Sequence, residues 1–128
     1  MAHLIPENLK YTEEHEWALL EADILTLGIT DFAQSSLGDI VFMELPEIDA
    51  VMAKGDSFGV VESIKSVSDL YSPVAGTIVA TNLELADNPE QCNTAPYESW
   101  MIKIKLDDVE QVSALLAVDD YKKLCEEA

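Results

Sequence analysis

Short apolar runs, each closed by turn-forming residues, are the feature that most constrains this fold. The segment WMIKIKL (100–106) places Trp100 and the apolar residues that follow it at every second position on one face of a strand. Met101 and two lysines fall on the other face. Earlier runs are interrupted by glycine or by Ser-Pro, which punctuate strands in this way. Many short strands bury their apolar faces by stacking sheets. We therefore expect a mostly β sandwich with minor α content.

The first half of the chain contains three recognisable elements. WALLEADILTLGIT (17–30) predicts a hairpin whose turn lies at 21–23. A short helix should begin after Thr30, a good N-cap residue, and end at Gly38. DIVFMELPEID (39–49) is an apolar run closed by proline, which predicts a strand buried on both faces. The large aromatic residues are expected mainly in the core: Trp17, Phe42 and Trp100.

The second half ends in a helical pattern. LELADNPEQCNTAPYES (83–99) is a polar connection with room for one helical turn. From about 107 to 128 the apolar period changes to that of a helix. One stripe begins at Val109 and ends at Leu116, and a second comprises Tyr121, Leu124 and Cys125. We expect a single domain, 1–128, with short helices and a helical C-terminus at about 107–128.

The charge of the chain excludes several classes of partner. It has 25 acidic and 7 basic residues, a formal net charge of −18, and every basic residue is lysine. Such a charge repels nucleic acid phosphates and anionic membranes, so neither is an expected partner. The chain also lacks arginine, the usual bidentate ligand of phosphates. The same charge favours a monomer.

The compartment is predicted from what the sequence lacks. No apolar run reaches the length of a membrane span, and the opening segment has no basic region followed by an apolar core. The two cysteines, Cys92 and Cys125, have no CxxC partners, which favours free thiols in a reducing compartment over a disulfide. We expect a cytoplasmic protein, or one of the mitochondrial matrix if it is a processed eukaryotic form.

Signatures of catalysis are absent from the sequence. His3 and His15 are the only histidines, and neither has a second histidine at metal-ligand spacing or lies near a glycine-flanked serine. No glycine-rich nucleotide-binding motif occurs. Pairs of carboxylates are numerous, but in so acidic a chain most belong to a solvated face. We expect neither a metal site nor an enzyme.

One lysine stands out in an apolar context. In VVESIKSVSDLYSPVAG (60–76), Lys65 lies between two β-branched segments, where a tight hairpin turn is expected. A lysine there can simply face water and discourage edge-to-edge pairing of strands. It can also be presented for covalent modification, held in place by the flanking strands. The pattern of residues does not decide between these interpretations.

The sequence around Lys65 resembles the lipoyl-attachment segment of the glycine cleavage system H protein family. The resemblance extends over roughly residues 8–128 and includes further matches in the order typical of the family: HEW (15–17), LGITDFAQSSLGDIVFMELPE (27–47), TNLELADNP (81–89) and PYESWMIKIK (96–105). Biotin carriers usually flank their lysine with methionine, and lipoyl domains of 2-oxo acid dehydrogenases typically have Asp-Lys-Ala. Ile64-Lys65-Ser66 is more similar to the H protein branch.

The resemblance implies a fold and a function. The fold is the barrel-sandwich hybrid of lipoyl and biotinyl carriers, with the modified lysine on a hairpin turn. The function is that of a non-catalytic carrier, with lipoate in amide linkage to Lys65. It shuttles an aminomethyl group from the pyridoxal-phosphate glycine decarboxylase (P protein) to the aminomethyltransferase (T protein). Dihydrolipoamide dehydrogenase (L protein) reoxidises the arm, and a lipoyl ligase or transferase attaches it.

The resemblance also implies a cleft that protects the carried group. Carboxylates there would keep its nitrogen in the ammonium form, because nearby negative charge favours protonation. The matching positions are Glu16 and Asp69. Two departures from the pattern of relatives occur nearby: Glu14 replaces a small hydroxyl residue, and Ser36 replaces a histidine found in some relatives. Glu14 is a weaker candidate for the cleft, and Ser36 is left outside it.

Two other functions remain open on sequence grounds. A lipoyl-relay donor to other lipoate-dependent complexes would also need Lys65 but has no ammonium to shield, so Glu16 and Asp69 favour the aminomethyl carrier. An unlipoylated scaffold that only binds partners is the third possibility. The intact VESIKSVSD segment (61–69) argues against it.

Overall fold

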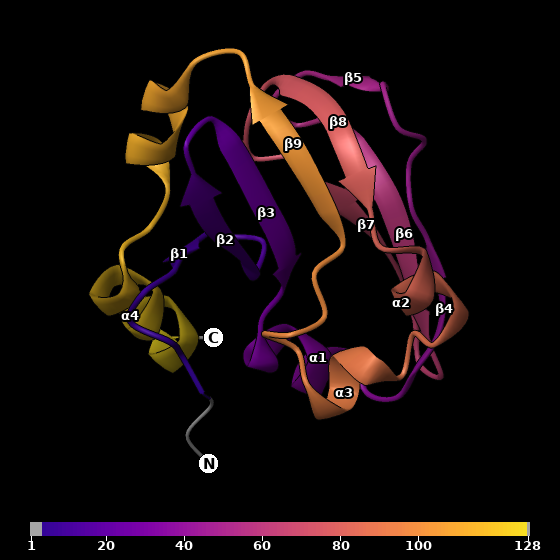
Figure 1. Ribbon diagram of the computed structural model, residues 1–128. Coiled ribbons are helices and arrows are strands. Elements are labelled where there is room, and N and C mark those ends of the chain that lie inside the picture. The colour runs from indigo at the N-terminus through magenta and orange to yellow at the C-terminus, as the bar shows by residue number, and fades with distance from the viewer. Residues whose placement is uncertain (1–3, 128) are drawn as a thin grey trace.

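Two antiparallel sheets form the body of the structure, a computed structural model that describes residues 4–127 (Figure 1). The strand order is β1-β2-β3-β9-β8-β5 in the larger sheet and β4-β6-β7 in the smaller one. The strands have these bounds: β1 Lys10–Tyr11, β2 Glu16–Glu21, β3 Ile24–Ile29, β4 Ile40–Glu44, β5 Val51–Met52, β6 Ser57–Ser63, β7 Val67–Tyr71, β8 Gly76–Thr81 and β9 Ile102–Leu106. The prediction of a mostly β fold is confirmed.

Strands with alternating apolar residues pair at the centre of the larger sheet. Strands β2 and β3 pair from Glu21↔Ile24 onward, and Ala22 turns the chain with φ of 56°, so the predicted hairpin is confirmed. In β3 and β9, Leu25 lies opposite Ile104, and both are fully buried. The inner faces of both sheets share one apolar core, to which Val61 of β6 also contributes.

Two predictions about buried faces are wrong. Strand β4 is an edge strand of the smaller sheet, where a register shift between Ile40 and Phe42 leaves Val41 and Phe42 57% and 45% exposed. A bulge turns consecutive side chains outward in this way. Met101, predicted on the polar face, is fully buried and belongs to the main core cluster; it lies just before the start of β9.

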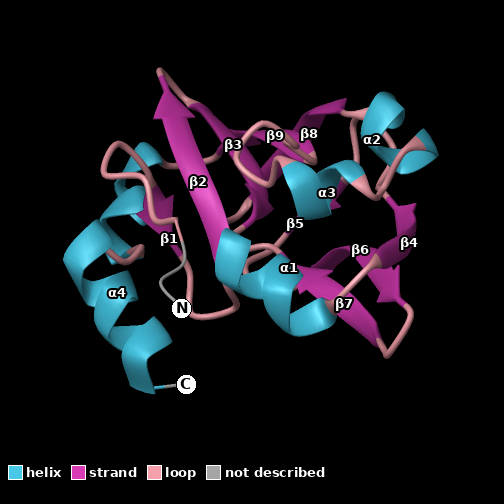
Figure 2. Ribbon diagram, turned by 90° about the horizontal axis from the view of Figure 1, so that it is seen from below, coloured by secondary structure: helices cyan, strands magenta, loops and turns pink. Residues whose placement is uncertain are grey.

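Short helices cover the ends of the sheets. Helix α1 (Asp31–Leu37) begins after Thr30, whose hydroxyl accepts a hydrogen bond from Ala33 N, and ends at Gly38, as predicted. The polar connection contains two short helices rather than one turn, α2 (Leu83–Asp87) and α3 (Gln91–Thr94). Helices α1 and α3 lie together at one end of the molecule (Figures 1 and 2).

The C-terminal segment folds as two separate helices. A 3₁₀ helix, η1 (Val109–Ala114), is followed by an extended link and then by α4 (Val118–Glu127). The predicted stripe from Val109 to Leu116 is therefore wrong as a single helical face, and Val109 is exposed. The stripe on α4 is confirmed, because Tyr121 is buried and stacks on Tyr11 with ring centroids 4.5 Å apart.

Three further observations concern the chain ends, the cysteines and the length of the helices. The expected domain also includes residues 1–3 and 128, and these, with His3, lie outside the described residues. Cys92 and Cys125 are free thiols, as predicted. Within residues 4–127 no helix has the length and apolar character needed to span a membrane.

Candidate functional site

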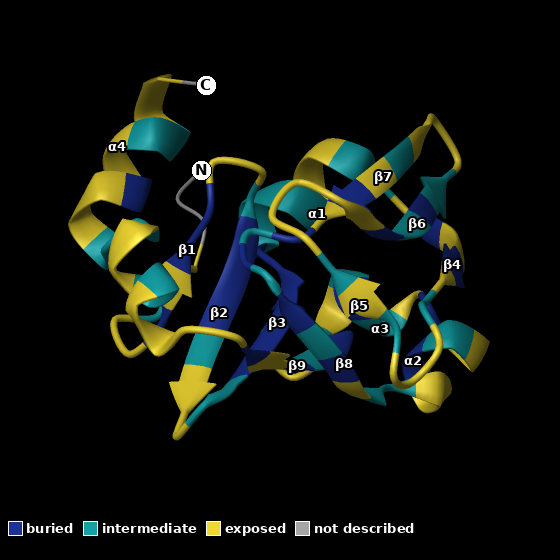
Figure 3. Ribbon diagram, turned by 90° about the horizontal axis from the view of Figure 1, so that it is seen from above, coloured by how far each residue is buried: buried dark blue, intermediate teal, exposed yellow. Residues whose placement is uncertain are grey.

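The turn between β6 and β7 is exposed (Figure 3). Lys65 lies in this turn and is exposed. Ser63, the last residue of β6, closes the turn: its backbone N donates to Ser66 O at 2.8 Å, and its hydroxyl oxygen accepts from the backbone N of Lys65 and of Ser66, both at 3.2 Å. These bonds join residues no more than three positions apart. The predicted location of Lys65 in a hairpin turn is therefore confirmed, and the turn itself is closed by local hydrogen bonds.

Glu16 lies in a different environment, at the start of β2. Its side chain is only 2% exposed. Thr12 Oγ1 donates to Glu16 Oε1 at 3.2 Å and accepts from Glu16 N at 3.2 Å, whereas Oε2 is buried without a hydrogen-bond partner. Burial raises the pKa of Glu16 to about 8; the Thr12 hydrogen bond acts against this, and the nearby Glu14 charge adds to it. Glu16 is thus largely protonated at neutral pH.

A network of tertiary hydrogen bonds holds the loop that carries Glu14 and Glu16. His15 has φ of 64°, an unusual conformation for a non-glycine residue. Its Nδ1 lies 2.8 Å from the hydroxyl of Tyr121 on α4, and that hydroxyl lies 2.7 Å from Thr30 Oγ1. Burial lowers the pKa of His15, and the Glu14 charge partly offsets this. The C-terminal helix therefore fixes the loop in place.

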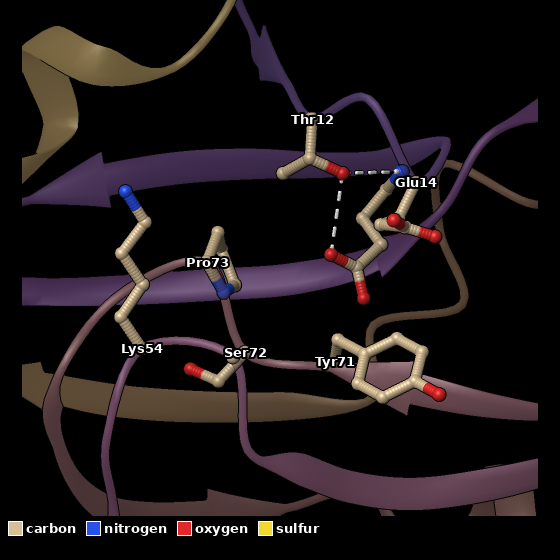
Figure 4. Close-up of a pocket in the computed structure, with 8 residues that line it drawn as sticks. Thr12, Glu14, Lys54, Tyr71, Ser72 and Pro73 are labelled. Carbon is tan, nitrogen blue, oxygen red and sulfur yellow. Dashed lines mark hydrogen bonds between the residues drawn. The ribbon is translucent and has the colours of Figure 1, made fainter.

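Two neighbouring cavities lie between this loop and strand β7. The larger, of about 470 Å³, has Glu14 and Asp69 on its walls together with apolar side chains. The smaller, of about 340 Å³, is lined by Thr12, Glu14 and Glu16, among others. Glu14 and Tyr71 line both cavities. Figure 4 shows Glu14 and Tyr71 on one side of the smaller cavity and Lys54 on the other.

The predicted site residues are therefore brought together only in part. Asp69 and Glu16 line different cavities, and Glu14, the weaker candidate, borders both. Asp69 is exposed on β7, and Lys65 is not among the lining residues of either cavity. Ser36, which the sequence interpretation left outside the cleft, lines the larger cavity.

Some lining residues were missed by the sequence interpretation. Tyr71 follows Asp69 by two positions on a strand, so period-two alternation could have placed both on one face. The Tyr71 hydroxyl lies 3.5 Å from Asp69 Oδ2. Thr12 and Lys54 come from separate loops, and no local signal identifies them. Within residues 4–127 no group of three or more potential ligands is arranged to hold a metal ion.

Comparison with known proteins agrees with this geometry. The family model described as glycine cleavage H-protein matches residues 9–128. The chain belongs to the glycine cleavage H-protein family. A glycine cleavage system H protein of Staphylococcus carnosus is 53% identical over 121 residues, which cover 94% of this chain and 96% of that protein. One from Halalkalibacterium halodurans is 52% identical over 124 residues, 96% of this chain and 97% of that protein.

A solved structure supports the same assignment. The crystal structure of a glycine cleavage system H protein from Mycobacterium marinum matches with a TM-score of 0.85 and 36% identity, covering 93% of this chain and 97% of that one. The resemblance to the H-protein family, inferred above from the segment around Lys65, is confirmed. The fold is that of the H-protein family as well.

Proposed function

We propose that this chain is the lipoylated carrier of the glycine cleavage system, with lipoate attached to Lys65. The observation that carries the proposal is the position of Lys65, an exposed amine at a locally fixed hairpin tip in a member of the H-protein family. The chain's part is to present this amine and to receive the carried group. It is proposed as a non-catalytic component of a multienzyme system.

The described residues fit a lipoyl arm. Lys65 supplies an exposed amine that can form the amide bond. The larger cavity offers apolar walls, including Ile29, Leu37 and Val61, which suit a hydrocarbon chain. Glu14 and Asp69 add carboxylates at the same cavity, which suit a cationic end group. When bound, the dithiolane of lipoate supplies the redox chemistry and the attachment point for the aminomethyl cargo.

The acids of the cleft are proposed to hold the nitrogen of the cargo as an ammonium. A protonated nitrogen has no free lone pair with which to expel the thiolate, so carboxylates that favour the protonated form slow loss of the cargo. Asp69 and Glu14 are exposed enough to be hydrated. Glu16 is buried with an unpartnered Oε2, and an ammonium beside it would favour ionisation of its carboxyl group.

The partners are proposed from the same function. They are the glycine decarboxylase (P protein), the aminomethyltransferase (T protein), dihydrolipoamide dehydrogenase (L protein) and a lipoyl ligase or transferase. A net charge of −18 favours docking on basic surfaces of these enzymes. We propose a monomeric single-domain carrier that works in the cytoplasm, since the relatives described above are bacterial.

The lipoyl-relay function is not favoured by the comparisons, because these relatives are named for the glycine cleavage system. A relay donor also gives no role to the acids that border the two cavities.

Reconstitution tests the proposed function. The lipoylated chain is mixed with the glycine decarboxylase, the aminomethyltransferase, dihydrolipoamide dehydrogenase, glycine, tetrahydrofolate and NAD⁺, and NADH formation is followed. We expect glycine-dependent NADH formation with the lipoylated chain and none with the same chain lacking lipoate. A lipoylated chain that stays inactive, while an authentic H protein works with the same enzymes, would contradict the proposal.

A further inference from the structure

The turn that follows α1 contacts the side chain of the proposed attachment lysine. A Cβ atom added to Gly38 would lie 3.0 Å from Lys65 Cε and 3.9 Å from its Nζ. The stem of Lys65 therefore lies against a residue that has no side chain. Gly38 follows Ser36 and Leu37, two residues of α1 that line the larger cavity. The Cε end of the lysine side chain thus lies beside the turn that ends the helix forming one wall of this cavity.

The same turn is bonded to the hairpin tip through the backbone. Ile64 N donates to Asp39 O at 3.0 Å. Ile64 immediately precedes Lys65, so this bond ties the hairpin tip to the turn that follows α1. It is distinct from the Ser63 hydrogen bonds, which shape the hairpin turn itself but do not connect it to another element.

Asn93 on α3 holds this turn from the other side. Its side-chain Nδ2 donates to Gly38 O at 2.9 Å and to Gln34 Oε1 at 3.0 Å, and its Oδ1 accepts from Ile40 N at 2.9 Å. One half-buried amide thus joins the end of α1 to the start of β4. The residues between these two anchors, Gly38 and Asp39, are the ones that meet the hairpin tip.

We propose that Gly38 and Asn93 are positioning residues for Lys65. Asn93 fixes the turn, the turn binds the hairpin tip at Ile64, and the missing side chain of Gly38 leaves a seat for the lysine stem. A lysine side chain loses rotamer entropy when it is fixed. If the Lys65 side chain already packs against Gly38, it has lost part of its rotamer freedom before it binds a modifying enzyme or the arm enters the cavity. Such preorganisation lowers the entropic cost of binding.

The proposal rests on the proposed lipoylation of Lys65. It adds that Gly38 and Asn93 determine the direction in which the lipoyl arm leaves the hairpin. Gly38 also has φ of 83°, so any replacement strains the backbone. Gly55 provides a matched control: its φ is 92°, but nothing lies within 4 Å of a Cβ added there. Gly38→Ala and Gly55→Ala therefore both place an alanine at positive φ, and only the first puts a methyl group against the side chain of Lys65.

The experiment measures attachment of lipoate to the unmodified chain. A lipoate–protein ligase, lipoate and ATP are supplied at a temperature at which every variant is folded, and initial rates are compared. We expect Gly38→Ala to slow attachment about fivefold relative to Gly55→Ala, the effect of forcing a side chain off its preferred rotamer. Asn93→Ala should slow it about threefold. Equal rates for the two alanine variants would overturn the proposal.

An NMR measurement on the wild-type chain is independent of any variant. We expect nuclear Overhauser contacts between the Lys65 ε-methylene protons and the Gly38 α-protons in the unmodified chain, and their loss in Asn93→Ala. Absence of these contacts from the wild type would also overturn the proposal. The two hypotheses fail separately: a wild type that accepts no lipoate contradicts the proposed function, whereas a lipoylated wild type with equal variant rates contradicts only the seat.

Discussion

The two walls of the cleft are built in opposite ways. The hairpin wall is formed by Asp69 and Tyr71 of β7, both exposed. The turn at its end carries Lys65 outside both cavities and is closed by bonds from Ser63 to nearby residues. The loop wall carries Glu16, which is buried and held by partners from other parts of the chain. The residues His15 and Tyr121, whose side chains meet in that wall, are 106 positions apart.

This difference suggests that the two walls have separate roles in the function of the cleft. An exposed hairpin can be modified or substituted at little cost in stability, because few contacts are lost. A buried loop tied to the C-terminal helix cannot, because each change leaves a polar group without its partner. We infer that the hairpin wall presents the attachment point, and the loop wall determines the shape and charge of the cleft. The predictions below test this division.

The largest expected effect concerns the pH dependence of stability at Glu16. Its folded pKa of about 8 exceeds the ordinary value of a glutamate, 4.5, because the carboxyl group is buried. The folded state therefore binds more protons than the unfolded state between these values, and this group makes stability fall as pH rises from about 4.5 to 8. Glu16→Gln removes this effect. The free energy of unfolding of the variant should therefore exceed that of the wild type by up to about 5 kcal/mol at pH 8.5, and the two should differ little at pH 4.5.

Denaturant unfolding at several pH values measures this difference. Glu13→Gln removes one charge from the exposed part of the same loop and controls for net charge. A Glu16→Gln variant whose stability runs parallel to that of the wild type across this range would show that the loop wall does not bury a carboxyl group.

A pair of matched tyrosine variants compares the two walls directly. Tyr121→Phe removes the hydroxyl that meets His15 and Thr30 and should lower the free energy of unfolding by about 1 to 3 kcal/mol. Tyr71→Phe removes an exposed hydroxyl from the hairpin wall and should change it by less than about 0.5 kcal/mol. Urea unfolding measures both, and similar losses in the two variants would refute the division.

The smallest expected effect on stability is at Asp69, where function should change instead. Asp69→Asn removes an exposed negative charge from the larger cavity and should alter stability by less than about 0.5 kcal/mol. The loaded chain should nevertheless release its aminomethyl group faster, because the ammonium form is less favoured. Asp107→Asn, on the exposed loop after β9, is the control. Equal release rates in both variants would remove Asp69 from the proposed shielding.

Local signals predicted much of the fold and one wall of the site. The hairpin turn around Lys65, the β2–β3 hairpin, and the limits of α1 at Thr30 and Gly38 depend on residues close together in the sequence. Turn and capping preferences act over that range, which is why these elements could be predicted without the structure.

The remainder depends on contacts that join distant segments. The outward turn of Phe42 follows from a bulge at an edge strand, and the burial of Met101 follows from its packing in the core shared by the two sheets. The unpartnered oxygen of Glu16 depends on how strand β2 packs. Glu14 borders both cavities only because loop and hairpin come together in the fold. The pattern of apolar residues does not encode these relations locally.

The most direct test of the central claim is intact-mass analysis with peptide mapping, on chain produced in a lipoate-supplied host and on its Lys65→Arg variant. We predict one lipoyl increment that maps to Lys65, complete loss of that increment in the variant, and closely similar melting temperatures for the two. An unmodified Lys65 under conditions that lipoylate a control substrate, or an increment mapped to another lysine, would contradict the account.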